Sequence, residues 1–186
     1  MTQNVKTYER SRQEDRSEAV KNLSLGAILL ALGTVTHTVF RGPDFLLACM
    51  FVAISMTNTK KEVLVLVFAS SILTGMTQSS PIGTIASFFD KFISGYFFLF
   101  LYRTLGEKRR DNIVIFAVIV AIATFLSGYI YFASSLGLAK VFGIAKTASV
   151  AKRGVIIPIL TLVSPTALIN ALIATSFKKA LKLSRF

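Results

Sequence analysis

Six apolar runs, separated by short polar or charged connections, constrain the fold of this 186-residue chain more than any other feature. A membrane-spanning helix needs about 20 mostly apolar residues, because each residue advances it about 1.5 Å through a hydrocarbon core about 30 Å thick. The runs cover residues 22–40, 45–57, 63–77, 79–102, 112–136 and 155–177. They predict an all-α polytopic membrane protein with six transmembrane helices.

The segments that flank these runs divide the chain into three parts. Residues 1–21 carry charges of both signs and predict a solvated tail or a short surface helix. A signal peptide is not expected there, because the first apolar run starts late and several more follow. Residues 22–177 form the membrane domain, within which residues 137–152 predict a lysine-bearing loop or a short amphipathic helix. Residues 178–186 form a basic tail.

The formal net charge of +12 raises the possibility of a nucleic-acid partner. The basic residues, however, stand at the ends of the apolar runs, where they report membrane topology instead. If both termini lie on one side, that side holds fifteen of the 21 Lys and Arg residues, and only five lie on the other. In membrane proteins the side richer in Lys and Arg is the cytoplasmic one. The distribution therefore predicts a multi-pass cell-membrane protein with both termini in the cytoplasm and no nucleic-acid partner.

One apolar run contains an adjacent acid and base, Asp90 and Lys91. A charge at the bilayer centre costs about 2.5–3.5 kcal/mol on insertion scales, so such residues usually form pairs, line cavities or bind ligands. Neighbours on a helix point about 100° apart, so we expect that the two side chains need not neutralise each other. The lysine can extend to the membrane surface, and the shorter aspartate cannot. Two interpretations follow, an interhelical salt bridge or a site for a small polar or zwitterionic ligand.

The predicted topology brings further polar and aromatic residues to the outer end of the bundle, where they suggest an outward-facing pocket. We expect Asp90 to accept a ligand ammonium, and Lys91, Arg41 or His37 to hold a carboxylate. The remaining candidates for the pocket are Asp44, Gln78, Phe88, Phe89, Tyr129 and Tyr131. Gln78 would take remaining hydrogen bonds, and the aromatic rings would stack on a flat ligand. A lone histidine such as His37 is also compatible with a hydrogen-bonded packing role.

Several motifs of enzymes are missing from the sequence. It contains no Gly-x-x-x-x-Gly-Lys-Ser/Thr phosphate loop and no Gly-x-Ser-x-Gly nucleophile motif. With one histidine and the single cysteine Cys49, it has no His/Cys cluster with metal-ligand spacing. We therefore expect no metal, no cofactor and no catalysis, and an energised transport step would need a partner protein.

Two small residues four positions apart, Ala27 and Ala31, lie in the first apolar run with Gly26 and Gly33 beside them. Small side chains at this spacing let another helix approach closely in lipid. The pattern is compatible with packing inside the bundle or with a surface for a partner helix.

Three stretches together resemble the substrate-binding (S) component of an energy-coupling factor (ECF) transporter of the tryptophan type. They are residues 27–31, residues 37–44 running into FLLACMF, and residues 85–97 with Asp90-Lys91-Phe92. The resemblance covers all six runs and implies a six-helix protein that binds a small solute near the outer face. It further implies a transmembrane coupling subunit and two ATPase subunits as partners, with Ala27 and Ala31 facing the coupling subunit. The long charged amino-terminal segment departs from the family pattern.

Uptake of tryptophan is therefore the expected function, and three alternatives remain. The ligand is another flat, vitamin-like molecule in the first alternative, because S-components share a fold while binding different solutes. The second is a membrane scaffold in which the charges only join helices. In the third, a small membrane enzyme uses Asp90 as an acid or base with His37 nearby. A ligand-binding assay separates transport from a scaffold, and turnover of the ligand would indicate the enzyme.

Overall fold

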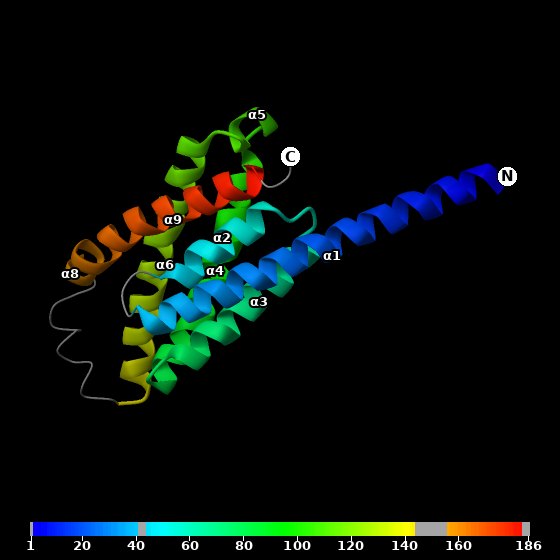
Figure 1. Cartoon of the computed structure of the whole chain (residues 1–186). Coiled ribbons are helices and arrows are strands. Elements are labelled where there is room, and N and C mark those ends of the chain that lie inside the picture. Colours follow the sequence, from blue (N-terminus) through cyan, green and yellow to red (C-terminus); the bar gives the residue numbers. More distant parts are fainter. Residues whose placement is uncertain (1, 41–43, 144–155, 184–186) are drawn as a thin grey trace.

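The computed structural model describes residues 2–40, 44–143 and 156–183, and every regular element in these ranges is helical. Figure 1 shows the helices as a bundle from which the amino-terminal part of one helix projects. The elements are α1 (Thr2–Val39), α2 (Phe45–Ser55), α3 (Lys60–Thr77), α4 (Pro81–Thr104), α5 (Glu107–Arg110), α6 (Ile113–Val141), α8 (Ile156–Pro158), the π-helical segment η2 (Ile159–Val163) and α9 (Ser164–Leu183). The prediction of an all-α membrane fold is confirmed.

Four helical segments in the described part of the chain are long and apolar enough to cross a membrane: Arg12–Val39, Pro81–Thr104, Ile113–Val141 and Ile159–Lys182. Helix α2 has 11 residues and is therefore only about 16 Å long, too short to cross the core by itself. Its residues 46–54 are all buried, so α2 contacts other helices on every side. A helix that is apolar all round belongs in the interior, and α2 forms the centre of the bundle.

The charged segment 1–21 is not separate from the first apolar run. Helix α1 extends without a break from Thr2 to Val39, and its amino-terminal part projects beyond the other helices (Figure 1). Glu18 accepts a hydrogen bond of 3.3 Å from the Asn58 side chain, between α2 and α3. The carboxyl-terminal part of the predicted loop 137–152 lies outside the described residues, and α6 continues to Val141.

Helix boundaries coincide with side chains that cap exposed backbone N–H groups. Asp44 accepts a hydrogen bond from the Leu47 N–H at the start of α2, and Thr59 and Glu62 form a capping box at the start of α3. Helix α4 begins with Ser80 as cap and Pro81 in its first turn, where the missing N–H of proline costs nothing. These caps set where each helix begins and thereby the positions of the side chains that follow.

The sixth predicted run is one rod made of α8, η2 and α9, with a π-helical turn between Pro158 and Pro165. Proline has no N–H to donate to the preceding turn, so an irregular turn before Pro165 is expected. The widened turn lies against Gly128 of α6, where an added Cβ would come within 2.5 Å of the Val163 side chain. Gly128 thus lets the rod approach α6 closely.

The helices surround α2 in a fixed order. Helix α1 packs against α2 and α3, α4 packs between α3 and α6, and α9 crosses α6 and α2 (Figure 1). Stacked rings of Phe51, Phe98 and Tyr102 fill the core between α2 and α4. Because neighbouring helices alternate in direction, the end of α1, the start of α2, the end of α3 and the start of α4 meet at one end of the bundle.

Candidate functional site

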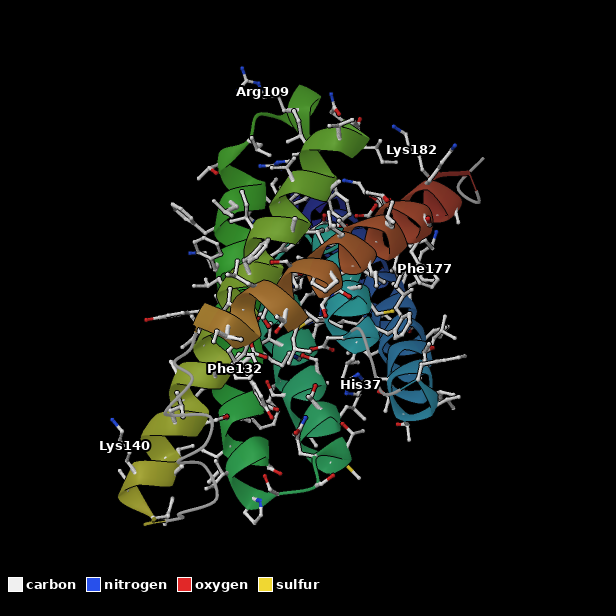
Figure 2. All side chains as sticks on the ribbon, turned by 90° about the vertical axis from the view of Figure 1, so that its left-hand side faces the viewer. His37, Arg109, Phe132, Lys140, Phe177 and Lys182 are labelled. Atoms are coloured by element: carbon white, nitrogen blue, oxygen red, sulfur yellow. The ribbon has the colours of Figure 1, made fainter. Side chains whose placement is uncertain are left out.

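A cavity of about 250 Å³ lies between the helices toward this end of the bundle. Each of the principal helices contributes to its wall, so it forms only when the bundle is assembled. Its lining residues are His37, Asp44, Leu47, Thr74, Gln78, Ser87, Asp90, Lys91, Thr124, Ser127, Gly128, Tyr131, Phe132, Leu162, Val163 and Thr166. Figure 2 shows His37 and Phe132 at a similar level of the bundle, with Arg109 and Lys182 toward one end and Lys140 at the other.

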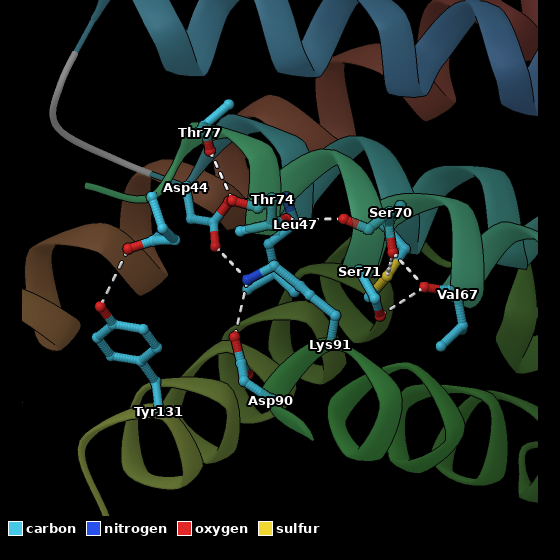
Figure 3. Close-up of polar contacts among 12 residues, drawn as sticks. Asp44, Leu47, Val67, Ser70, Ser71, Thr74, Thr77, Asp90, Lys91 and Tyr131 are labelled. Atoms are coloured by element: carbon cyan, nitrogen blue, oxygen red, sulfur yellow. Dashed lines mark hydrogen bonds and ion pairs between the residues drawn. The ribbon is translucent and has the colours of Figure 1, made fainter. Parts of the chain in front are cut away.

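A three-residue charge cluster, Asp44, Lys91 and Asp90, forms the polar wall of this cavity (Figure 3). Lys91 Nζ lies 2.5 Å from Asp44 Oδ2 and 2.8 Å from Asp90 Oδ2. The Lys91 and Asp90 side chains are 2% and 3% exposed, so both charges are removed from solvent. The expectation that Asp90 and Lys91 need not pair is wrong, because the flexible lysine chain folds back toward the preceding carboxylate. The lysine is also too buried to reach the membrane surface.

Asp44 has two structural roles, one for each of its carboxylate oxygens. Its Oδ1 accepts a hydrogen bond of 3.0 Å from the Leu47 N–H and caps α2, while Oδ2 receives Lys91 from α4. The cap holds the carboxylate at the positive end of the α2 dipole, which favours its ionised form. The Asp44–Lys91 bond therefore joins the start of α2 to the middle of α4. Of the two predicted charges, Lys91 forms an interhelical salt bridge, whereas Asp90 pairs with Lys91 within α4.

Two buried polar atoms in the cavity wall remain available to a ligand. Asp90 Oδ1 and His37 Nδ1 have no hydrogen-bond partner among the described residues. Ser127 of α6 places its hydroxyl beside Asp90 and interacts with the carboxylate. With all three groups ionised, the charge cluster carries one more negative than positive charge. Since an unpaired buried polar group is costly, Asp90 Oδ1 points to a ligand that donates a hydrogen bond, and His37 Nδ1 to a further polar group on that ligand.

Gln78 and Tyr131 close the cavity on its other side. The Tyr131 hydroxyl donates a hydrogen bond of 3.3 Å to Gln78 Oε1, which joins the end of α3 to α6 (Figure 3). Cavity residues Thr74 and Thr124 donate their hydroxyls to carbonyl groups of their own helices, at 2.8 Å each. Their methyl groups are then free to contact a ligand.

The structure brings together six of the predicted site residues and places the other described ones elsewhere. His37, Asp44, Gln78, Asp90, Lys91 and Tyr131 line the cavity. Tyr129 does not line it and is 54% exposed, because it is on another face of α6 than Tyr131. Phe88 packs against Phe68 and Phe92 in an aromatic row outside the cavity, and the ring of Phe89 is half exposed. Arg41 lies outside the described residues.

Sequence reasoning missed the small and hydroxylated side chains that α6 contributes. Thr124, Ser127, Gly128 and Tyr131 have the 0, 3, 4, 7 spacing of one helix face, and they interrupt an otherwise apolar run. This stripe was a readable signal for the cavity-facing side of α6. The described residues include no group of His, Cys, Asp and Glu side chains that could hold a metal ion.

Comparisons with known proteins give a consistent result. The model of the family described as tryptophan transporter TrpP matches residues 19–184. A probable tryptophan transport protein of Bacillus subtilis is 30% identical over 62% of this chain and 70% of its own length. A protein of the same description from Clostridium perfringens is 26% identical over 65% of this chain and 72% of its own length. No solved structure matches this chain.

Proposed function

This chain belongs to the TrpP family of tryptophan transporters, and we propose that the cavity between its helices binds tryptophan. The protein would serve as the membrane-embedded substrate-binding subunit of an ECF-type uptake system. It would bind the amino acid without altering it chemically.

The charge cluster is the observation that carries this proposal. With both carboxylates ionised, the cluster around Lys91 has a net negative charge, and Asp90 Oδ1 is buried without a partner among the described residues. A ligand ammonium placed at Asp90 would supply both the missing hydrogen bonds and the missing positive charge. Such a pair is favourable only if it is well satisfied, because desolvating either charge alone is costly.

The carboxylate of the amino acid requires donors on the same side of the cavity. A lysine ammonium has three N–H groups, and Asp44 and Asp90 use two of those on Lys91. The third is available to a ligand carboxylate, and His37 Nδ1 can donate when the proton resides on that nitrogen. Gln78 would take a remaining hydrogen bond. The cavity would thus bind the two opposite charges of an amino acid within one cluster.

Energy for uptake would come from separate coupling and ATPase subunits, because the sequence has no phosphate-binding loop. Ala27 and Ala31 are exposed on α1, one turn apart, and offer a smooth surface to a helix of the coupling subunit. The distribution of basic residues supports a cell-membrane location with both termini in the cytoplasm and the cavity nearer the outer face.

Fluorescence offers a direct test, because the chain has five tyrosines and no tryptophan. Bound tryptophan would be the only indole present, and Tyr131 lines the cavity. Excitation of tyrosine in the purified protein should produce indole emission that rises to saturation as tryptophan is added. Recovery of unchanged tryptophan from the complex would agree with binding without catalysis. Absence of a saturable signal, together with no thermal stabilisation by tryptophan, would refute the proposed substrate.

A further inference from the structure

A second, mainly apolar cavity of about 600 Å³ adjoins the charged one. It lies between the first turns of α4 and the carboxyl-terminal half of α6, and its apolar wall includes Ile82, Ile85, Leu136 and Phe142. Tyr131 and Phe132 line both cavities. The two rings are adjacent, with their centroids 5.7 Å apart. They form the boundary that a single ligand occupying both cavities would cross.

The adjoining cavity is the larger and the more apolar of the two. Pockets for small molecules usually measure about 300–1,000 Å³, and the charged cavity of about 250 Å³ is below this range. Its wall also carries the charge cluster and several hydroxyls, whereas an indole ring needs apolar contact over both faces. The adjoining cavity adds a larger apolar surface to that which Leu47, Leu162 and Val163 provide in the charged cavity.

One polar atom in the apolar cavity matches the one polar atom of an indole. Ser135 lines this cavity, and its Oγ is buried with no regular hydrogen bond among the described residues. Ser135 follows Tyr131 by one helical turn and lies beside its hydroxyl. A hydroxyl can accept as well as donate, and an indole has a single N–H donor and no acceptor. A buried hydroxyl that lacks a well-formed hydrogen bond is costly, so a ligand donor at Ser135 would reduce that cost.

We infer that tryptophan occupies both cavities, with its ammonium and carboxylate at the charge cluster and its indole beyond Tyr131 and Phe132. Ser135 Oγ accepts the hydrogen bond of the indole N–H and is the residue that selects indole over other flat rings. This inference rests on the proposed function and assigns the part of the site that determines specificity.

The test compares tryptophan with 3-benzothienylalanine, in which sulfur replaces the indole N–H at nearly the same shape. Affinities for both are measured calorimetrically on the wild-type chain, on Ser135→Ala and on Ser134→Ala. The control residue Ser134 precedes Ser135 on α6 and lines neither cavity. Wild type and Ser134→Ala should prefer tryptophan by roughly two- to tenfold, the value of one net hydrogen bond. Ser135→Ala should lose that preference by binding tryptophan more weakly while its affinity for benzothienylalanine stays unchanged.

Each outcome separates this inference from the proposed function. Equal wild-type affinities for the two ligands would overturn the role of Ser135. This comparison uses only the wild-type chain, so its result does not depend on whether a variant folds. An undiminished preference in Ser135→Ala would also overturn it and would leave the apolar cavity to another occupant, such as a lipid acyl chain. If the wild-type chain bound no tryptophan at all, the proposed function itself would fall.

Discussion

Asp90→Asn is the substitution that most directly tests the proposed binding of an ammonium. Asparagine has nearly the same shape as aspartate and keeps one carbonyl oxygen, but it removes the negative charge. Lys91 retains Asp44 as its partner, so the substitution leaves no unpaired lysine in the interior. The change therefore affects mainly the interaction with the ligand.

The expected magnitude follows from the burial of Asp90, whose side chain is 3% exposed. Removing one partner of a buried, hydrogen-bonded charge pair at an interface costs about 2–5 kcal/mol. At about 1.4 kcal/mol for each factor of ten, tryptophan affinity should fall roughly 30- to 4,000-fold. The upper part of this range applies if the ammonium has no other acceptor in the cavity.

Tyrosine-sensitised indole emission measures this affinity without a label, and thermal unfolding of the free protein measures stability in parallel. Asp111→Asn provides a matched control, because Asp111 is 75% exposed and lies at the opposite end of the bundle from the charged cavity. The control should bind tryptophan as the wild type does. If Asp90→Asn bound tryptophan normally but unfolded at a lower temperature, Asp90 would be a structural ion-pair residue and the reasoning would be refuted.

Two further substitutions test the bundle and its partner. Lys91→Met should lower the free energy of unfolding by about 3–5 kcal/mol, because it leaves the buried Asp90 and the partly buried Asp44 without their cation. Lys60→Met, at an exposed position, should have little effect. Equal melting temperatures of the two variants would contradict this. Leucine at both Ala27 and Ala31 should abolish uptake and co-purification with the coupling subunit while tryptophan binding persists, because both alanines are exposed and outside the cavity. Uptake that survives the double substitution would show that this surface contacts no partner.

The helical membrane fold could be predicted from the sequence because it depends on local properties. Apolar runs of sufficient length must form helices in lipid, where every backbone polar group needs a partner within the chain. Composition also located Asp90 and Lys91 as unusual charges in an apolar run. The same reasoning did not distinguish a crossing helix from the short central helix α2, because burial by neighbouring helices is not a local property.

The site itself was decided by tertiary packing. The Asp44–Lys91 bond joins residues 47 positions apart, and only the packing of α2 against α4 brings them within reach. Packing likewise sets the rotation of each helix about its axis, which turns Tyr131 into the cavity while Tyr129, two residues earlier, remains exposed. Residue types therefore revealed which chemistry was available, and helix rotation determined which of those side chains face one another. A change of about 100° for each residue along a helix is enough to separate a cavity residue from a surface residue.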